Sequence, residues 1–103
     1  MRRFPPNKRF YAYIMSNISW RPLYVGFTSN LIRRVWEHKT NAFGGYTGRY
    51  RIDRLVYYET FRYANNAINR EKELKKWSRA KKIALVKSKN PQWDDPSRDW
   101  FKT

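Results

Sequence analysis

The sequence predicts a single domain of the α+β class, in which helices pack on a small three-stranded sheet, antiparallel or mixed. Three observations support this class. The chain has 103 residues, the length of one ordinary domain. Its hydrophobic content of 41% and aromatic content of 18% are too high for a disordered chain. Three short apolar runs have the length of strands, and three longer runs have the spacing of helices.

The first two runs predict a β-hairpin. They cover residues 10–15 and 23–27, and the turn-rich stretch 16–22 connects them. Side chains alternate between the two faces of a strand. If the aliphatic side chains of both strands share one face, then Tyr13 and Tyr24 share the other.

The remaining elements follow from capping residues and periodicity. Residues 28–30 supply capping side chains for a helix over 31–39, and the Val- and Tyr-rich stretch 54–61 predicts a third strand. A second helix covers about 64–77, because this stretch contains no Gly or Pro. Ser78 caps a third helix that runs to about Lys87, before Asn90 and Pro91 end it.

The charge predicts an anionic partner. The chain has 23 Lys and Arg against 8 Asp and Glu, a net charge of +15. Such an excess is usual where phosphates are the ligand, because binding releases their counterions. Solubility alone, a ribosomal role and a membrane-surface role stay open, although the basic residues are spread over several elements. Without cysteine, and with one histidine, a metal would need carboxylate oxygens.

The expected organisation is simple. Residues 1–9 form a basic flexible arm, residues 10–95 the folded domain and residues 96–103 a C-terminal tail. The N-terminus does not read as a secretory signal, and no run approaches the ~18 apolar residues of a membrane span. We therefore expect a cytoplasmic protein with no membrane contact.

The linker of residues 40–51 holds three of the four glycines together with aromatic and basic side chains. One interpretation is a loop that wraps a nucleic-acid backbone, with Arg49 and Arg51 on phosphates and Phe43 or Tyr46 against a base. The other is an ordinary flexible connection whose aromatic side chains fold back onto the sheet.

One carboxylate interrupts the apolar stripe of the second helix. At about 100° per residue, Glu71 falls near the centre of the cluster formed by alanines, Ile68 and Leu74, whereas Glu73 falls on the opposite side. A carboxylate at the edge of a core is retained if it binds a cation or pairs with a basic residue. Glu71 is therefore a candidate metal ligand or a member of a buried ion pair, and Glu73 is a surface residue.

The first helix carries a second candidate group. Arg34 and His38 are four residues apart on the flank of its apolar stripe, so the pair can face a cleft. Arg33 and Glu37 have the same spacing but point further away, and we interpret them as a surface ion pair of little energetic value. His38 taken alone is equally well explained as an incidental, half-exposed histidine.

Together these residues suit the hydrolysis of a phosphodiester bond. A Mg²⁺ ion held by one carboxylate, waters and phosphate oxygens can polarise the phosphorus. Arginine offers a planar pair of donors for the charge that develops on the phosphate. Tyrosine, with an ordinary pKa of about 10, can orient a water molecule, or deprotonate it if nearby cations lower that pKa.

The same residues resemble the motifs of the GIY-YIG nuclease family, and in particular its small stand-alone bacterial branch. Residues 11–13, Tyr-Ala-Tyr, stand where Gly-Ile-Tyr belongs, and residues 24–26, Tyr-Val-Gly, stand for Tyr-Ile-Gly. Tyr13 and Tyr24 are eleven residues apart, and Arg34 follows ten residues later, where the family has its catalytic arginine. Residues 71–74, Glu-Lys-Glu-Leu, are similar to the family's metal-binding segment, and the run 71–77 resembles the stand-alone branch.

The resemblance implies a GIY-YIG endonuclease-like fold with an antiparallel sheet, and one Mg²⁺ or Mn²⁺ ion at Glu71. Tyr13 or Tyr24 would position the attacking water, Arg34 would bind the scissile phosphate and His38 would assist proton transfer. Further candidates for contacts to the nucleic-acid backbone are Lys39, Arg49, Arg51 and Lys72.

The resulting hypothesis is a metal-dependent endonuclease that cuts DNA, with branched or damaged structures and a role in repair or recombination as the expected context. The alternative is a nucleic-acid-binding protein that has the same basic fold and cuts nothing. The sequence does not identify a partner protein that would bring this protein to its substrate. Two departures from the family pattern stand out: Tyr11 replaces the glycine of the first motif, and Asp94 stands where many relatives have asparagine.

Overall fold

The fold is a three-stranded antiparallel sheet with helices on both faces, as predicted. The computed structural model describes residues 9–40 and 45–102, with the side chains of residues 46 and 47 left undescribed. Its elements are β1 (Phe10–Ser16), β2 (Tyr24–Thr28), α1 (Leu31–Lys39), α2 (Gly45–Arg49), β3 (Arg54–Phe61), α3 (Ala64–Lys76) and α4 (Arg79–Lys89).

Strand β1 lies in the middle of the sheet, between β2 and β3. It pairs with both neighbours in antiparallel fashion, and the register sets Tyr13 opposite Gly26 on one side and opposite Tyr58 on the other. A bulge interrupts the pairing with β3, because Ile14 faces Tyr57 whereas the next residue faces Leu55. The predicted hairpin is therefore confirmed, and the third strand joins its other side.

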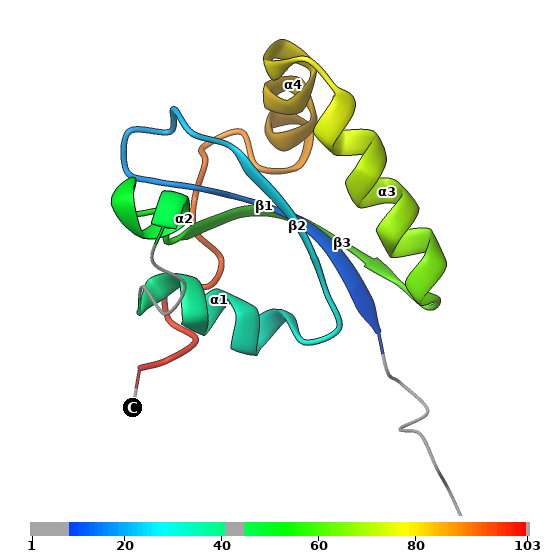
Figure 1. Ribbon diagram of the computed structural model, residues 1–103. Helices are drawn as coiled ribbons and strands as arrows, with labels where there is room; N and C mark the ends of the chain where they lie inside the picture. The colour runs from blue at the N-terminus through cyan, green and yellow to red at the C-terminus, as the bar shows by residue number, and fades with distance from the viewer. Residues whose placement is uncertain (1–8, 41–44, 103) are drawn as a thin grey trace, which may run out of the picture.

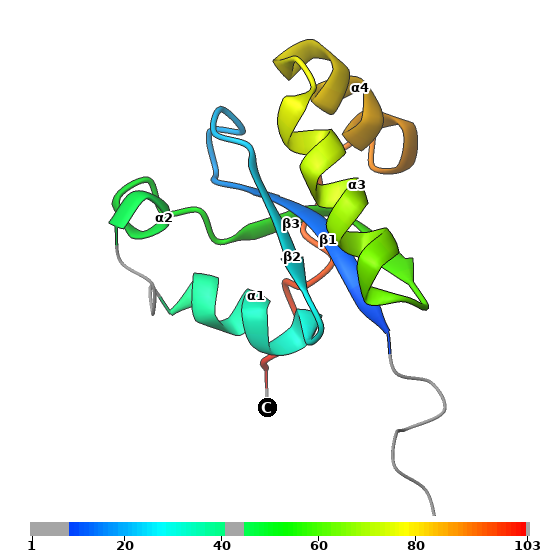
Figure 2. The same ribbon diagram turned by 45° about the vertical axis from the view of Figure 1, so that its right-hand side comes forward.

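The two faces of the sheet carry separate cores. We call the face that α1 covers the α1 face, and the face covered by α3 and α4 the α3 face (Figure 1). In Figure 2 the same helices again lie on opposite sides of the strands. The core of the α1 face consists of Tyr13, Met15, Leu31, Val35, Ile52 and Leu55. The core of the α3 face consists of Ile14, Val25, Val56, Tyr57, Leu74, Val86 and Trp93.

Two helices begin at the predicted capping residues. The side-chain oxygen of Asn30 accepts a hydrogen bond of 3.1 Å from the backbone N–H of Arg33 at the start of α1. Ser78 accepts one of 3.2 Å from the backbone N–H of Lys81 at the start of α4. Such caps satisfy backbone donors that have no partner within the helix.

The C-terminal segment packs onto the α1 face beyond residue 95, where we placed the end of the domain. Asp95 accepts hydrogen bonds from the backbone N–H groups of Leu55 and Ser97 and pairs with the Lys39 ammonium at 2.8 Å. Phe101 then packs against the core of that face. These contacts tie the segment to both β3 and α1.

Part of the sequence-based prediction concerns residues outside the structure's described ranges. Residues 1–8 of the basic arm and the linker residue Phe43 belong to this part, as does the side chain of Tyr46. The described end of the linker forms the short helix α2. None of the helices in the described ranges has both the length and the apolar character that crossing a membrane requires.

Candidate active site

The centre of the site is Tyr13, which is fully buried on the α1 face. Its ring reaches across β2, because a Cβ atom added to the paired residue, Gly26, would overlap with the tip of the ring. Glycine at position 26 therefore leaves the space in which the Tyr13 hydroxyl lies. This gives the second motif a structural reason that the sequence alone did not supply.

Helix α1 adds His38 to the two tyrosines. The Tyr13 hydroxyl lies 3.4 Å from Nε2 of His38. The ring centroids of Tyr24 and His38 are 5.2 Å apart, and those of Tyr13 and Tyr24 are 6.4 Å apart. The three rings therefore pack against one another, and the expected sharing of one face by Tyr13 and Tyr24 is confirmed.

Burial keeps the Tyr13 phenol protonated. Desolvation raises the pKa of Tyr13 above its ordinary value of 10.0, and the neighbouring Tyr24 acts in the same direction. The Arg34 guanidinium lowers that pKa, through its charge and a hydrogen bond, but by less than burial raises it. At neutral pH Tyr13 is therefore a hydrogen-bond donor. Its nearby cation does not lower its pKa enough to make it a base in the free protein, contrary to the possibility raised from the sequence.

His38 is neutral at physiological pH. The residue is 2% exposed, and desolvation, helped by the positive charge of Arg34, lowers its pKa from 6.5 to about 4. A neutral imidazole has one ring nitrogen that accepts a hydrogen bond. His38 therefore suits the acceptance of a hydrogen bond from Tyr13, and it is not the half-exposed histidine of the alternative interpretation.

Arg34 shares Glu37 with its neighbour Arg33. Glu37 lies 3.2 Å from Nε of Arg34 and 3.4 Å from Nε of Arg33. The predicted ion pair between Arg33 and Glu37 is therefore present. Glu37 does not point away from the site, however, because it also pairs with Arg34 and its negative charge acts on both Tyr13 and His38. The signal was present in the sequence, because residues three apart on a helix are also neighbours.

A polar pocket opens beside Arg34 where β2 meets α1. Its volume is about 330 Å³. The lining residues are Phe27, Thr28, Ser29, Asn30, Arg33 and Arg34. Two guanidinium groups and several hydroxyl and amide groups make this opening suitable for a phosphate.

Glu71 lies on α3, the helix that packs against the strands carrying the two tyrosines. Its side chain is 15% exposed and forms an ion pair of 2.6 Å with Lys75, whose own side chain is 57% exposed. Glu73 is 54% exposed and pairs with Arg70. The structure thus brings Tyr13, Tyr24, Arg34 and His38 together on the α1 face. It places Glu71 on α3, which covers the opposite face of the sheet, with a solvent-exposed partner.

The carboxylate of Glu71 suits a magnesium ion whose other ligands are waters and phosphate oxygens of the substrate. Within the described ranges no group of three or more His, Cys, Asp or Glu side chains could hold a metal ion by itself. Mg²⁺ does not require such a cage, since it is usually held by one or two carboxylates together with waters and substrate phosphates. Lys75 is a flexible, exposed partner that such an ion can displace.

The remaining candidates have different surroundings. Arg49, Arg51 and Lys72 are exposed. The Lys39 ammonium binds both the Asp53 carbonyl and Asp95 at 2.8 Å, so its position has a structural explanation.

The two departures from the family motifs also have places in the fold. Tyr11 packs edge-on against Tyr58, with ring centroids 6.3 Å apart, on the β3 side of β1. Its bulk therefore lies toward β3, whereas the Tyr13 ring reaches toward β2. Asp94 is exposed and is fastened through its backbone to the side chain of Asn90, which also binds the Val56 carbonyl.

Comparisons with known proteins point to one family. The model described as the GIY-YIG catalytic domain matches residues 9–84. The UPF0213 protein of Syntrophus aciditrophicus is 37% identical over 83 residues, which are 80% of this chain and 93% of that protein. A UPF0213 protein of Natronomonas pharaonis is 43% identical over 77 residues, 74% of this chain and 88% of that one. The solution NMR structure of a UPF0213 protein from Bacillus halodurans has a TM-score of 0.54 at 28% identity and covers 92% of this chain and 99% of its own.

Proposed function

Because the chain belongs to the GIY-YIG family, as its motifs predicted, we propose that it is a metal-dependent endonuclease that hydrolyses phosphodiester bonds in DNA. The observation that carries this proposal is the convergence of two phenols, a neutral imidazole and a guanidinium on the α1 face. These groups come from three separate elements. Nothing in the packing of an apolar core requires polar groups there, and burying them costs free energy unless they are hydrogen-bonded or paired, so their presence favours a functional role.

In this proposal Arg34 binds the scissile phosphate. Its side chain is 34% exposed and lies at the polar pocket, so a phosphate oxygen can reach it from solvent. Arg34 would then exchange Glu37 for the substrate, because an exposed ion pair has little energetic value to lose. The charge that develops on the phosphate strengthens this contact as the reaction proceeds.

The aromatic residues orient the attacking water. Tyr24 is partly exposed and is the phenol that a water can approach. Tyr13 stays protonated and donates a hydrogen bond, while neutral His38 accepts one at Nε2. A divalent ion held by Glu71 would supply Lewis-acid stabilisation of the phosphate and the leaving oxygen.

The substrate is expected to be branched or damaged DNA, as in repair or recombination. Arg49, Arg51 and Lys72 would hold its backbone through exposed positive charge. Such contacts position a nucleic acid without reading its sequence. Lys39 is not part of this proposal because its ammonium is occupied within the protein.

A second candidate function is nucleic-acid binding without cleavage. The observation in its favour is the Glu71–Lys75 ion pair, which occupies the carboxylate that the nuclease needs for its metal. Both functions predict binding that weakens with salt, by about 0.9 in log K per log unit of salt for each phosphate neutralised. The cleavage product therefore distinguishes them, and affinity does not.

The test is cleavage of supercoiled, flapped and branched DNA with Mg²⁺ or Mn²⁺, with matched variants on each helix. Arg34→Ala should lower the rate by about 10²–10³-fold, as expected for a donor to the developing charge. Arg33→Ala should lower it much less, because Arg33 lines the pocket but only Arg34 also acts on Tyr13 and His38. Glu71→Gln should abolish the metal-dependent activity, and Glu73→Gln should retain it. Equal losses within either pair, with folding intact, would contradict the proposal.

A further inference from the structure

The tip of the hairpin between β1 and β2 presents an aromatic ring on a rigid support. Trp20 is 45% exposed, and its backbone is left-handed, with φ at 60°. This conformation is uncommon for a bulky residue and has to be held by its surroundings. Here the ring stacks on buried Trp93, with centroids 6.1 Å apart and planes 26° apart. The ring is therefore fixed in place and still reachable from solvent.

Asn17 joins this tip to the segment that follows α2. The Asn17 side-chain amide donates a hydrogen bond of 2.8 Å to the carbonyl of Tyr50, and the Asn17 carbonyl accepts one of 2.9 Å from the backbone N–H of Trp20. Tyr50 is also 45% exposed, and the Arg49 guanidinium lies over its ring at 5.7 Å. One asparagine thus holds two exposed aromatic residues at the same end of the sheet.

Positive charge surrounds both rings. Arg79, the first residue of α4, donates a hydrogen bond of 3.3 Å to the Trp20 carbonyl, and a guanidinium has further donors to offer. Arg21 follows Trp20 directly, and the segments 17–21 and 45–51 contain no acidic residue. We call Trp20, Arg21, Arg49, Tyr50 and Arg79 the hairpin-tip surface.

We propose that the hairpin-tip surface binds unpaired nucleotides of the substrate, an inference that rests on the proposed action on nucleic acid. Exposed aromatic rings stack on bases of any sequence, and neighbouring cations hold the backbone. Trp20 is only four residues from Tyr24, so the chain between them spans at most about 14 Å. A nucleotide bound at Trp20 therefore lies within about 14 Å of the backbone of Tyr24, one of the residues of the cluster on the α1 face. The substrate class is a duplex with a single-stranded segment beside the cleaved bond.

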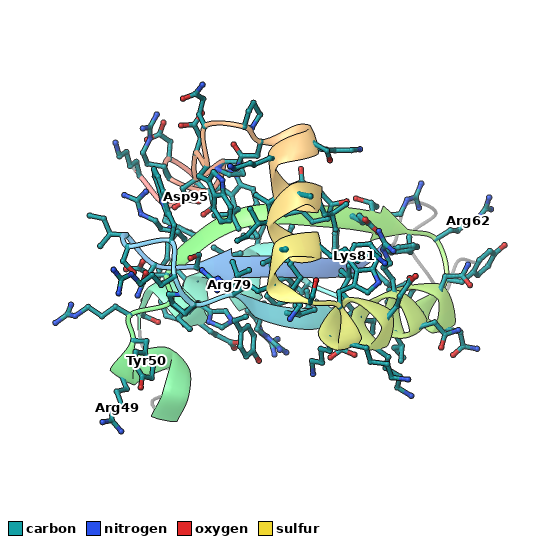
Figure 3. The ribbon with its side chains drawn as sticks, turned by 90° about the horizontal axis from the view of Figure 1, so that it is seen from above. Arg49, Tyr50, Arg62, Arg79, Lys81 and Asp95 are labelled. Carbon is teal, nitrogen blue, oxygen red and sulfur yellow. The ribbon has the colours of Figure 1, made fainter. Side chains whose placement is uncertain are left out.

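A similar aromatic and basic pair at the far end of the sheet provides a matched control. Tyr63 is 61% exposed, and the Arg62 guanidinium lies over its ring at 5.8 Å. Figure 3 shows Arg62 beyond one end of the sheet and Arg49 with Tyr50 beyond the other. The two pairs match in composition, and Tyr63 is the more exposed of the two tyrosines, so a general effect of surface aromatic residues should be at least as large for Tyr63 as for Tyr50.

The experiment measures binding by fluorescence anisotropy in the presence of a chelator, so that no DNA is cut. The probes are a labelled blunt duplex and the same duplex with a single-stranded overhang. We expect Tyr50→Ala and Trp20→Gly to weaken binding to the overhang probe by about tenfold, the loss of one base–aromatic contact, and binding to the blunt duplex by less than about twofold. Glycine at position 20 tolerates the left-handed backbone. Tyr63→Ala should alter neither affinity, and circular dichroism checks that each variant is folded.

The outcomes separate this inference from the nuclease proposal. Wild-type protein that binds both probes equally, or a Tyr63→Ala variant that loses as much as Tyr50→Ala, would overturn the inference and leave cleavage unaffected. Protein that prefers the overhang through Trp20 and Tyr50 but cuts no DNA would support the inference and count against the nuclease. If Trp20→Gly does not fold, Tyr50→Ala decides the question by itself, because this substitution keeps the backbone carbonyl of Tyr50 to which Asn17 donates its hydrogen bond.

Discussion

The two faces of the sheet differ in what they bury. On the α3 face the buried side chains are aliphatic apart from Tyr57 and Trp93, and the Tyr57 hydroxyl donates a hydrogen bond to Glu59. This face stabilises the fold by removal of apolar surface from water. On the α1 face the buried residues include Tyr13 and His38. Burial of polar groups costs free energy unless they are well paired, and the 3.4 Å separation between these two is long for a hydrogen bond. The comparison indicates that the α3 face mainly stabilises the fold, whereas the α1 face contains polar groups that lower stability and suit a chemical role.

The largest expected effect on stability comes from the α3 face. Leu74 is fully buried there, and Leu74→Ala should lower the free energy of unfolding by about 2–5 kcal/mol through lost burial and the cavity left behind. Urea denaturation measures this loss. Tyr13→Phe is the counterpart on the α1 face: it removes only a hydroxyl, so it should change stability by less than about 1 kcal/mol while reducing cleavage. If Tyr13→Phe proves as destabilising as Leu74→Ala, the distinction between the faces fails.

Gly26 tests the packing within the α1 face. Gly26→Ala places a methyl group where the tip of the buried Tyr13 ring lies, and overpacking of this kind costs about 1–3 kcal/mol. The cost should fall sharply when the same change is made in a Tyr13→Ala background, because the clashing ring is gone. A double-mutant cycle from denaturation curves measures this coupling. Equal costs in the two backgrounds would show that the glycine is needed for another reason.

His38 predicts how stability depends on pH. Below about pH 6.5 the unfolded chain binds a proton at this residue, whereas the folded chain does not until its lowered pKa of about 4 is reached. Acid therefore favours unfolding in this window, and stability should fall by up to about 2 kcal/mol between pH 6.5 and pH 5. His38→Gln should remove most of this dependence, since the chain has no other histidine. A wild-type protein equally stable at both pH values would contradict the buried, neutral imidazole.

The smallest expected effect concerns the rim of the α3 face. The Glu71–Lys75 ion pair is exposed on the lysine side and should contribute less than about 0.5 kcal/mol, so Lys75→Met should leave the denaturation midpoint almost unchanged. The same variant frees the carboxylate and should lower the Mn²⁺ concentration needed for half-maximal binding, measured by calorimetry. Weaker Mn²⁺ binding in Lys75→Met would argue that Glu71 does not hold the ion.

The sequence predicted local structure well because its signals are local. Caps at Asn30 and Ser78, and the alternation that places Tyr13 and Tyr24 on one face, depend on residues close together in the chain. The position of Glu71 on the inner flank of α3 also followed from helical spacing. Motif spacing then pointed to Tyr13, Tyr24 and Arg34, which lie together with His38 on the α1 face.

Contacts between distant segments could not be predicted in the same way. The Trp20–Trp93 stack and the Asn17–Tyr50 hydrogen bond join residues far apart in the chain, and no local sequence pattern predicts such contacts. Helix α2 was missed because glycines, which disfavour helices, make up part of it. The lowered pKa of His38 likewise depends on burial by several elements at once, which becomes visible only when the chain is folded.

The most direct test of the central claim is a Mn²⁺ titration of the protein followed through the NMR signals of its single histidine. If the ion held by Glu71 lies within reach of the cluster on the α1 face, this paramagnetic metal should broaden the imidazole signals of His38 in the wild type and in Glu73→Gln, and much less in Glu71→Gln. Sharp His38 signals in wild-type protein saturated with Mn²⁺, or broadening that persists in Glu71→Gln, would contradict a site built from Glu71 together with Tyr13, Tyr24, Arg34 and His38.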